Sequence, residues 1–254
     1  MEQTAVPVSE GPQGEPSRSL GLWARSVAIF VRPAQAWAGL ETRTQWWFPM
    51  LLTVTLTVAG SAALHDRALV PMMSESWDRQ VAAGAMTAER ADQMERFFAS
   101  PAGMAASIAP TLIILPVIVL GIALVIWFGV GFVLGTRFRY RHALEVAAWS
   151  SLINIPRQLV AYSSAWYKES FKGIHDGFGI LLPEADPPSR LLIGLGGFLD
   201  AIGPLAIWYV IVGILGATAL SGAPRKSVAW VLAGLYLAIA ALSSALAAMF
   251  APVS

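Results

Sequence analysis

Long stretches without a charged side chain dominate this sequence, and they predict helices that cross a membrane. A helix rises about 1.5 Å per residue, so roughly 20 consecutive apolar residues span the hydrocarbon core of a bilayer. Charged residues, and aromatic pairs such as Trp46 and Trp47 at the water boundary, delimit five such stretches. We therefore expect an all-α membrane helix bundle in residues 44–250, with five transmembrane helices at about 44–64, 107–135, 143–166, 199–220 and 227–250.

The second and third stretches are less regular than the others. Residues 97–136 are forty positions without a charge, about 60 Å as one helix, which is twice the bilayer core. Three prolines lie in its first half, so the span is placed at 107–135, and the turns before it are expected to kink or to lie at the interface. The third span contains Pro156, which is expected to bend it, and the polar residues Glu145, Asn154 and Arg157.

Ahead of the first span, residues 18–43 follow an amphipathic pattern. Apolar side chains recur at helical spacing from Leu20 to Val31, while arginines recur every seven residues on the opposite face. Such a helix can lie on an anionic membrane surface on the cytoplasmic side, or pack the same face against the bundle. Residues 1–17 are rich in Pro, Gly, Glu and Ser, which predicts a disordered tail. The expected lipid-surface contacts are Arg18, Arg25, Arg32 and Trp23.

Composition supports the membrane assignment and excludes several classes of function. Of the 254 residues, 56% are hydrophobic and 13% charged, against about 45–50% and about 25% in soluble domains. The residues outside the predicted spans are too few for a large soluble catalytic domain. The net charge of +1 does not suggest a nucleic-acid partner, and the lack of cysteine excludes disulfides and thiolate chemistry. The three histidines show no metal-ligand spacing, so we expect no cofactor, no metal and no enzymatic activity.

The distribution of basic residues predicts the orientation. With the N-terminus inside, the cytoplasmic segments hold nine Lys and Arg, and the longer outer loops hold seven against ten carboxylates. Both short loops that carry an excess of positive charge, around Arg139 and Arg225, fall on the same side as the N-terminus. We expect a multi-pass protein of an inner or plasma membrane with its N-terminus in the cytoplasm and its C-terminus outside. In the first outer loop, residues 87–98 predict a short charged helix.

A few polar residues inside the predicted spans form a candidate site. A charge in the membrane costs about 2.5–3.5 kcal/mol on insertion scales, so it needs a partner or a wet cavity. One hypothesis pairs Arg157 with Asp200 in the outer leaflet, in a pocket lined by Asn154 and Tyr162. In the other, Arg157 reaches the outer headgroups and Asp200 caps the fourth span near water.

Small residues are abundant at helical spacing. Gly131 and Gly135 form a GxxxG pattern at the inner end of the second span, and Ser244 and Ala248 continue the theme in the fifth. Such faces allow close helix packing. They serve either the packing within one chain or a homo-oligomer formed through the fifth helix.

The ordered features resemble the bacterial branch of the Yip-one (Ypt/Rab-interacting protein) membrane family. The resemblance rests on soft motifs from residue 27 to residue 250: Phe30-Val-Arg-Pro33, Trp47-Phe-Pro49, Met86-Thr-Ala-Glu89-Arg, Asn154-Ile-Pro156 and Ile207-Trp208. It implies a five-helix membrane domain with a cytoplasmic N-terminus. Eukaryotic relatives act in vesicle trafficking, where they bind small GTPases and shape membranes. Their acidic Asp-Leu-Tyr-Gly-Pro stretch ahead of the first span has no match here, so no functional residue carries over.

Together these observations predict a membrane protein without enzymatic activity, which organises the membrane or binds other proteins. Its partners would be the lipid bilayer and either another membrane protein or a second copy of the chain. The alternative is a small-solute transporter or channel with a polar site near Asn154 and Arg157, because interrupted spans often build binding sites at the membrane midplane.

Overall fold

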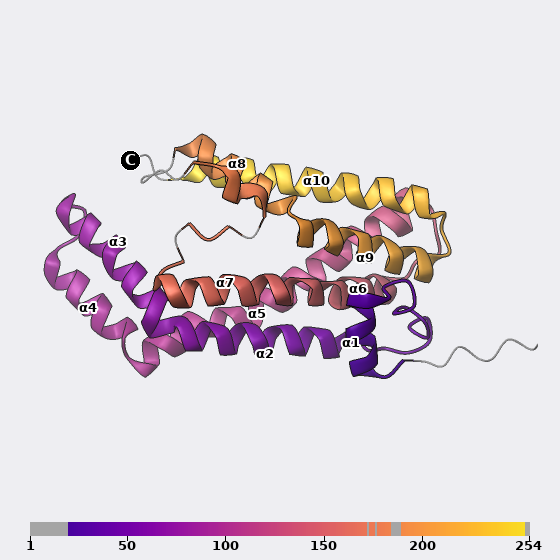
Figure 1. Cartoon of the computed structure of the whole chain (residues 1–254), viewed down its shortest axis with the longest axis horizontal. Coiled ribbons are helices and arrows are strands. Elements are labelled where there is room, and N and C mark those ends of the chain that lie inside the picture. Colours follow the sequence, from indigo (N-terminus) through magenta and orange to yellow (C-terminus); the bar gives the residue numbers. More distant parts are fainter. Residues whose placement is uncertain (1–19, 172, 176, 184–188, 252–254) are drawn as a thin grey trace, which may run out of the picture.

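The fold is known from a computed structural model, which describes residues 20–171, 173–175, 177–183 and 189–251. Within these residues every regular element is a helix. The long helices run nearly parallel to one axis, and a helical hairpin projects from one end of the bundle (Figure 1). The expected all-α bundle is thereby confirmed.

The first half of the described chain contains five α-helices and two π-helical segments. They are α1 (Leu22–Val31), α2 (Trp47–Leu64), η1 (His65–Leu69), α3 (Val70–Ala82), α4 (Ala88–Phe98), α5 (Pro101–Trp127) and η2 (Phe128–Val133). The second half follows with α6 (Tyr140–Ser150), η3 (Ser151–Ile153), α7 (Asn154–Lys168), η4 (Phe178–Leu181), α8 (Arg190–Ala201), α9 (Pro204–Ser221) and α10 (Arg225–Phe250).

Four helical stretches of the described chain are long and apolar enough to cross a membrane: Trp47–Ala82, Pro101–Val133, Pro204–Ser221 and Arg225–Phe250. The third predicted span, 143–166, is not among them because the short 3-10 turn η3 divides it into α6 and α7. These two helices nevertheless follow one another along the bundle beside α2 and α5 (Figure 1). The protein is therefore a multi-pass membrane protein with four uninterrupted candidate spans and one divided helical path.

Two of the helices extend beyond the predicted spans. The first helix does not end near Leu64 but continues through η1 and α3 to Ala82. The second begins at Pro101, where the Ser100 hydroxyl accepts a hydrogen bond from the Gly103 amide at 3.2 Å. Proline at the first helical position is well tolerated, and the helix then runs on through its two internal prolines. The expected interfacial or broken turns are thus part of one long helix.

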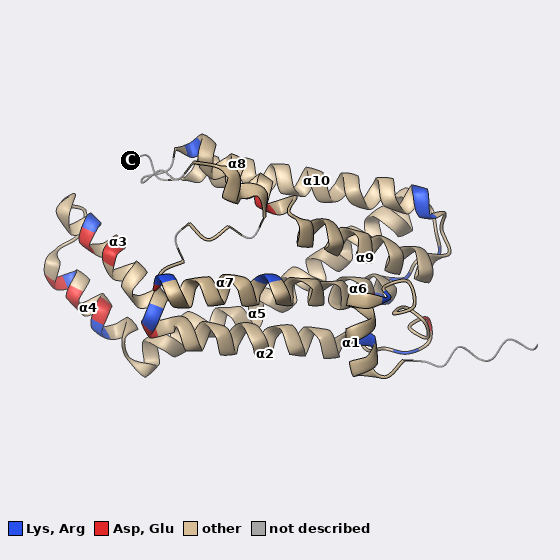
Figure 2. Cartoon of the chain, viewed as in Figure 1, with Lys and Arg blue, Asp and Glu red and all other residues tan. Residues whose placement is uncertain are grey.

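The charged helix predicted at 87–98 is α4, and it forms the projecting hairpin with α3. The Thr87 hydroxyl accepts a hydrogen bond from the Arg90 amide at 3.3 Å, which caps the start of α4. Acidic and basic positions are mixed on both helices of this hairpin (Figure 2). It has the character of a solvated loop, as the alternation of charges indicated.

The fourth predicted span corresponds to α9, which begins at Pro204, and α8 precedes it as a separate helix. Helices α8 and α9 lie one after the other along α10 (Figure 1), and the chain breaks between them at Ile202 and Gly203. Proline at the first position of α9 suits this restart. Asp200 therefore lies near the end of α8. It does not cap the helix that follows, contrary to the second sequence hypothesis.

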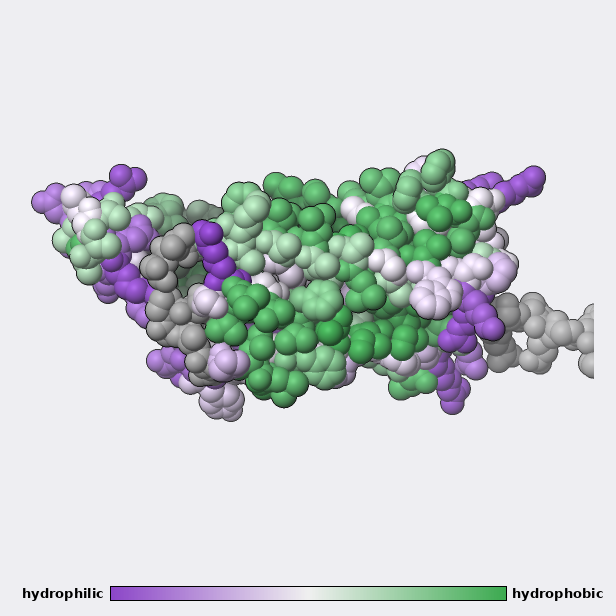
Figure 3. Space-filling model, turned by 90° about the horizontal axis from the view of Figure 1, so that it is seen from above, coloured by the Kyte–Doolittle hydropathy of each residue, from purple (hydrophilic) through white to green (hydrophobic). Residues whose placement is uncertain are grey.

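The best-packed core lies near the end of the bundle where α1 is found. Trp149 of α6 and Trp37, from the segment between α1 and α2, are almost fully buried there. A Cβ atom on Gly216 of α9 would lie 2.6 Å from the Trp37 ring, so only glycine allows this approach. Elsewhere large apolar side chains face outward, and the middle of the surface is predominantly apolar, with hydrophilic residues gathered at both ends (Figure 3). This distribution is the one expected of a bundle immersed in hydrocarbon.

Candidate functional site

Helix α1 lies across the end of the bundle, at a steep angle to the long helices (Figure 1). Its exposed side is apolar, with Trp23 68%, Val27 61% and Val31 67% exposed. Trp23 keeps one edge contact with Phe48 of α2, at 5.2 Å between ring centroids. A crosswise helix with an exposed apolar side, at the hydrophilic end of a membrane bundle, has the geometry of an interfacial helix.

Arg25 does not lie where the sequence predicted. Arg25 is fully buried, and its guanidinium donates hydrogen bonds to the carbonyl oxygens of Ala36, of Ala38 at 3.0 Å and of Leu20 at 3.4 Å. The expected lipid contact of Arg25 is therefore wrong. Arg32 is exposed, and Arg18 lies outside the described residues.

Arg25 belongs to a polar cluster that joins three elements. Its guanidinium lies over the ring of Trp149 on α6, 5.6 Å from the centroid. The Trp149 indole donates to the buried carboxylate of Glu145 at 3.1 Å, and that carboxylate accepts the backbone amide of Gln45, just before α2, at 2.7 Å. Burial lowers the pKa of Arg25, while the negative charge of Glu145 acts in the opposite direction. We name Arg25, Trp149, Glu145 and Gln45 the anchor cluster, because it fixes α1 to the bundle.

The periodicity of α1 correctly assigned its residues to two faces, but it did not predict what each face would contact. In a soluble protein the apolar face would turn to the core, and in a peripheral helix the arginines would meet phosphates. Here the carbonyl groups of the following turn, Ala36 and Ala38, supply the partners that Arg25 needs. Only the fold of residues 32–46 makes this possible, and no local pattern reveals it.

The proposed intramembrane pair of Arg157 and Asp200 does not form. The Asp200 carboxylate accepts hydrogen bonds from the backbone amides of Gly177 at 3.2 Å and Gly179 at 3.0 Å, and it lies 2.9 Å from His175 Nδ1. Asp200 thus fastens the segment between α7 and α8 to the end of α8. Within the described residues Asp200 has an ion-pair contact with His175 and none with Arg157.

Tyr162 takes part in a different polar contact, between α7 and α2. The Gln158 amide donates to the hydroxyls of Thr57 at 2.9 Å and Tyr162 at 2.8 Å, and the Tyr162 hydroxyl reaches the carbonyl of Thr57 at 3.3 Å. The Tyr162 ring lies against Gly60, where a Cβ would come within 2.0 Å of a ring carbon. We name Thr57, Gly60, Gln158 and Tyr162 the α2–α7 seam.

The four predicted site residues are therefore not gathered into one pocket. Tyr162 joins the α2–α7 seam, Asp200 joins the segment before α8, and Asn154 and Arg157 lie in the first turn of α7 after η3. Gln158 was not among the site residues predicted from the sequence. The sequence pattern that could have indicated it is the four-residue spacing of Gln158 and Tyr162 on one face of α7, opposite Thr57 and Gly60 on one face of α2.

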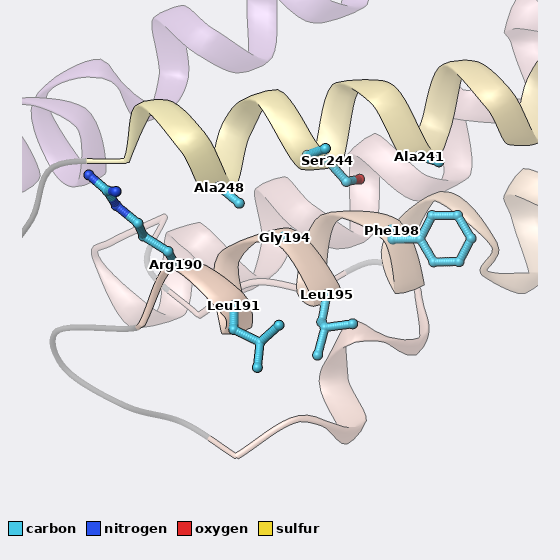
Figure 4. A pocket seen from close by; sticks show the side chains of 9 residues that line it. Arg190, Leu191, Gly194, Leu195, Phe198, Ala241, Ser244 and Ala248 are labelled. Atoms are coloured by element: carbon cyan, nitrogen blue, oxygen red, sulfur yellow. The ribbon is translucent and has the colours of Figure 1, made fainter.

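Small residues mediate helix contacts within the chain. Helices α8 and α10 approach closely where a Cβ on Gly194 would lie 3.0 Å from Ala248 and one on Gly197 would lie 3.3 Å from the Ser244 hydroxyl (Figure 4). A groove of about 420 Å³ runs along this contact, with Arg190 at one end donating to the Ala251 carbonyl at 3.3 Å. The Ser244 and Ala248 face of the fifth predicted span thus packs inside one chain.

The GxxxG pattern of the second span serves a different purpose. Gly135 has a φ of +63°, a left-handed conformation that favours glycine, and it follows the end of η2. Gly131 lies close to the carbonyl of Phe138 in the next segment, 3.3 Å from where its Cβ would be. The pattern marks a turn and the return of the chain rather than a face for another helix.

Among the residues with a described position, no three His, Asp or Glu side chains are placed to hold a metal ion. What the geometry offers is an apolar surface helix, hydrogen-bonded seams and apolar hollows.

Comparison with protein families decides the relationship of the chain. The model of the Yip1 domain matches residues 27–247. The chain belongs to the Yip1 family. The match runs from inside α1 to the last turn of α10, so it includes all of the helices from α2 to α9. Comparison with curated proteins gives no match, and neither does comparison with solved structures.

Proposed function

We propose that this Yip1 protein organises membranes without enzymatic activity, by holding an apolar helix in one leaflet only. The observation that carries the proposal is the orientation of α1, which exposes Trp23, Val27 and Val31 while Arg25 is buried in the anchor cluster. An interfacial helix displaces lipid to a depth of about 5–10 Å. Because α1 is fastened to the bundle, the displacement accompanies the protein wherever it resides.

We further propose that α1 lies in the cytoplasmic leaflet of an inner or plasma membrane, and that the divided path α6–α7 is the fifth crossing. Five crossings place the two ends of the bundle domain on opposite sides. In support, α1 and the end of α10 lie at opposite ends of the bundle (Figure 1), and the basic start of α10 lies at the same end as α1 (Figure 2). Short basic loops favour the cytoplasm. The C-terminus is then outside.

The depth of α1 is the first test. The chain has no cysteine, so a single Val27→Cys variant accepts one environment-sensitive label. In liposomes the label at position 27 is expected below the phosphates, and a matched label on Arg32→Cys at or outside them. Equal exposure of both labels to water would refute the membrane location of α1.

The shaping of membranes is the second test. Trp23→Ser combined with Val31→Ser removes much of the exposed apolar side, whereas Arg32→Ser changes an exposed residue of the following turn and leaves that side intact. With equal amounts of reconstituted protein, the double variant is expected to reduce the fraction of tubules and small vesicles at least about twofold. Membranes deformed to the same extent by the double variant and the native protein would exclude the wedge.

A small-solute transporter is the second candidate, favoured by one observation. Helix α7 restarts at Asn154 directly after η3, and interrupted helices build solute sites in many transporters. Solute flux in proteoliposomes that is lost in Asn154→Ala and Arg157→Ala variants would support transport. Flux equal to that of protein-free liposomes would exclude it.

A further inference from the structure

A second hollow lies between helices of the bundle and opens to its surface, away from α1 and from the α2–α7 seam. It has a volume of about 450 Å³ and lies between α5, α6, α9 and α10. Its described lining is apolar apart from three hydroxyls, on Ser150, Tyr209 and Tyr236, and it includes no charged residue. The volume falls in the range of about 300–1,000 Å³ that is usual for ligand pockets.

Two of these three hydroxyls are buried without a hydrogen-bond partner among the described residues. Ser150 is 1% exposed, and neither its Oγ nor the Tyr209 hydroxyl is bonded. The Tyr236 hydroxyl, by contrast, donates to the carbonyl of Ala201 at 2.6 Å. Serines in helices commonly return their hydroxyl to a backbone carbonyl, as the neighbouring Ser151 does to Ala148 at 2.7 Å. Ser150 and Tyr209 therefore retain unused hydrogen-bonding capacity in apolar surroundings.

Ser150 and Tyr209 line the same hollow from α6 and α9. Ser150 is the last residue of α6 before η3, and a Cβ on Gly213 of α9 would lie 3.8 Å from its Oγ. Tyr209 precedes Gly213 by four residues, one turn along the same face of α9. Ser150 is also ten residues beyond Tyr140, where α6 starts, or about 15 Å, half the thickness of the bilayer core. The pair of hydroxyls thus lies deep in the membrane.

We propose that this hollow binds a neutral lipid that carries a single oxygen function, a hydroxyl or a carbonyl. Its hydrocarbon chain would contact the apolar residues of α5 and α10, such as Ile122 and Leu232, and its oxygen would bond to Ser150 and Tyr209. A charged headgroup is disfavoured because no lining residue in the described chain offers an opposite charge. An ordinary phospholipid is disfavoured too, since its ester oxygens stay near the interface when the headgroup is in water. The proposal does not depend on α1 or on membrane shaping.

The ligand chemistry can be tested with photoactivatable probes of equal chain length. The full-length protein in liposomes is irradiated with diazirine-bearing hexadecanol, hexadecane or hexadecanoate, and the labelled peptides are identified by mass spectrometry. Hexadecanol is expected to label α5, α9 and α10 around the hollow about five- to tenfold more than hexadecane or hexadecanoate. That ratio of labelling corresponds to the free energy of about one hydrogen bond. Unlabelled hexadecanol should compete. Equal labelling by all three probes would overturn the proposal.

Two sets of variants locate the site. Gly121 lines the hollow and a Cβ there meets nothing within 4 Å, so Gly121→Leu can fill the space without a backbone clash. Gly234→Leu is the matched control, because Gly234 is equally free of neighbours but is not part of the lining. Hexadecanol labelling should fall at least about fivefold in the first variant and stay unchanged in the second. Undiminished labelling in Gly121→Leu would overturn the assignment of the site.

The role of the hydroxyls is tested separately. Ser150→Ala with Tyr209→Phe should lower hexadecanol labelling to the level of hexadecane, whereas Ser151→Ala should leave it unchanged. Retention of the preference for hexadecanol in the double variant would show that the hydroxyls do not bind the ligand oxygen and that water alone satisfies them. If the double variant does not fold, the Gly121→Leu comparison and competition in the native protein still decide the proposal.

Discussion

The attachment of α1 through Arg25 provides the most direct test of the fold near the membrane surface. Arg25→Met keeps an unbranched apolar side chain of similar length but removes the guanidinium and its hydrogen bonds to the carbonyls of Ala36 and Ala38. A hydrogen bond to a charged group contributes about 1.5–3 kcal/mol, and the removal of one member of a buried charged cluster costs about 3–5 kcal/mol. Allowing for the favourable burial of the methionine, we expect α1 to detach about 3 kcal/mol more easily.

The detachment can be measured by cysteine accessibility. Ala28 lies on the side of α1 turned to the bundle and is 9% exposed, and the chain has no other cysteine to interfere with an Ala28→Cys label site. Since about 1.4 kcal/mol is a factor of ten, Arg25→Met should raise the maleimide labelling rate at position 28 by roughly 100-fold. Arg25→Lys, which has fewer donors in a different geometry, should give an intermediate rate.

Arg32→Met is the matched control for this experiment. It removes the same group from the exposed end of the same segment, and labelling at position 28 should change by no more than about twofold. If Arg25→Met labels no faster than Arg32→Met, the guanidinium does not hold α1 in place and the reasoning is refuted. The deformation of liposomes by the Arg25→Met protein should decrease in parallel, because a detached α1 no longer has a fixed depth.

Two further predictions concern the interior. Gly60→Ala should destabilise the protein by about 1–3 kcal/mol in detergent, because the new methyl meets the Tyr162 ring. The double variant Gly60→Ala with Tyr162→Ala should lose less stability than the sum of the two single changes. Strict additivity would show that the two residues do not touch. Asp200→Ala should make the segment before α8 more sensitive to protease, because each amide left unpaired favours local opening by about 1–3 kcal/mol. Asp66→Ala is the control and should not change digestion, since the Asp66 side chain is 82% exposed. Equal digestion of both variants would contradict the role of Asp200 in fastening the segment.

The local pattern of the chain was sufficient for the fold class and the membrane assignment. Hydrophobic length and charge-free stretches do not depend on tertiary contacts, and they correctly indicated an all-α membrane protein and the helices around α5, α9 and α10. The soft motifs correctly indicated the Yip1 family. The short charged helix α4 was also predictable, because its cap at Thr87 and its amphipathic pattern are local features. The breaks were predicted only in part: Pro156 indicated the division after α6, whereas the local signal of Gly203 and Pro204 after α8 lay inside the predicted fourth span.

Tertiary structure alone decided which groups meet. Arg25 and Arg32 look equivalent in the sequence, yet one is buried against carbonyls thirteen or fewer residues away and the other is exposed. The sequence offered Arg157 as a partner for Asp200, but the Asp200 carboxylate accepts hydrogen bonds from the backbone amides of Gly177 and Gly179 instead. Periodicity assigns residues to a face of a helix, whereas the identity of what lies opposite that face depends on long-range packing. In a membrane, where apolar residues are stable both inside the bundle and against lipid, hydrophobicity cannot make that choice.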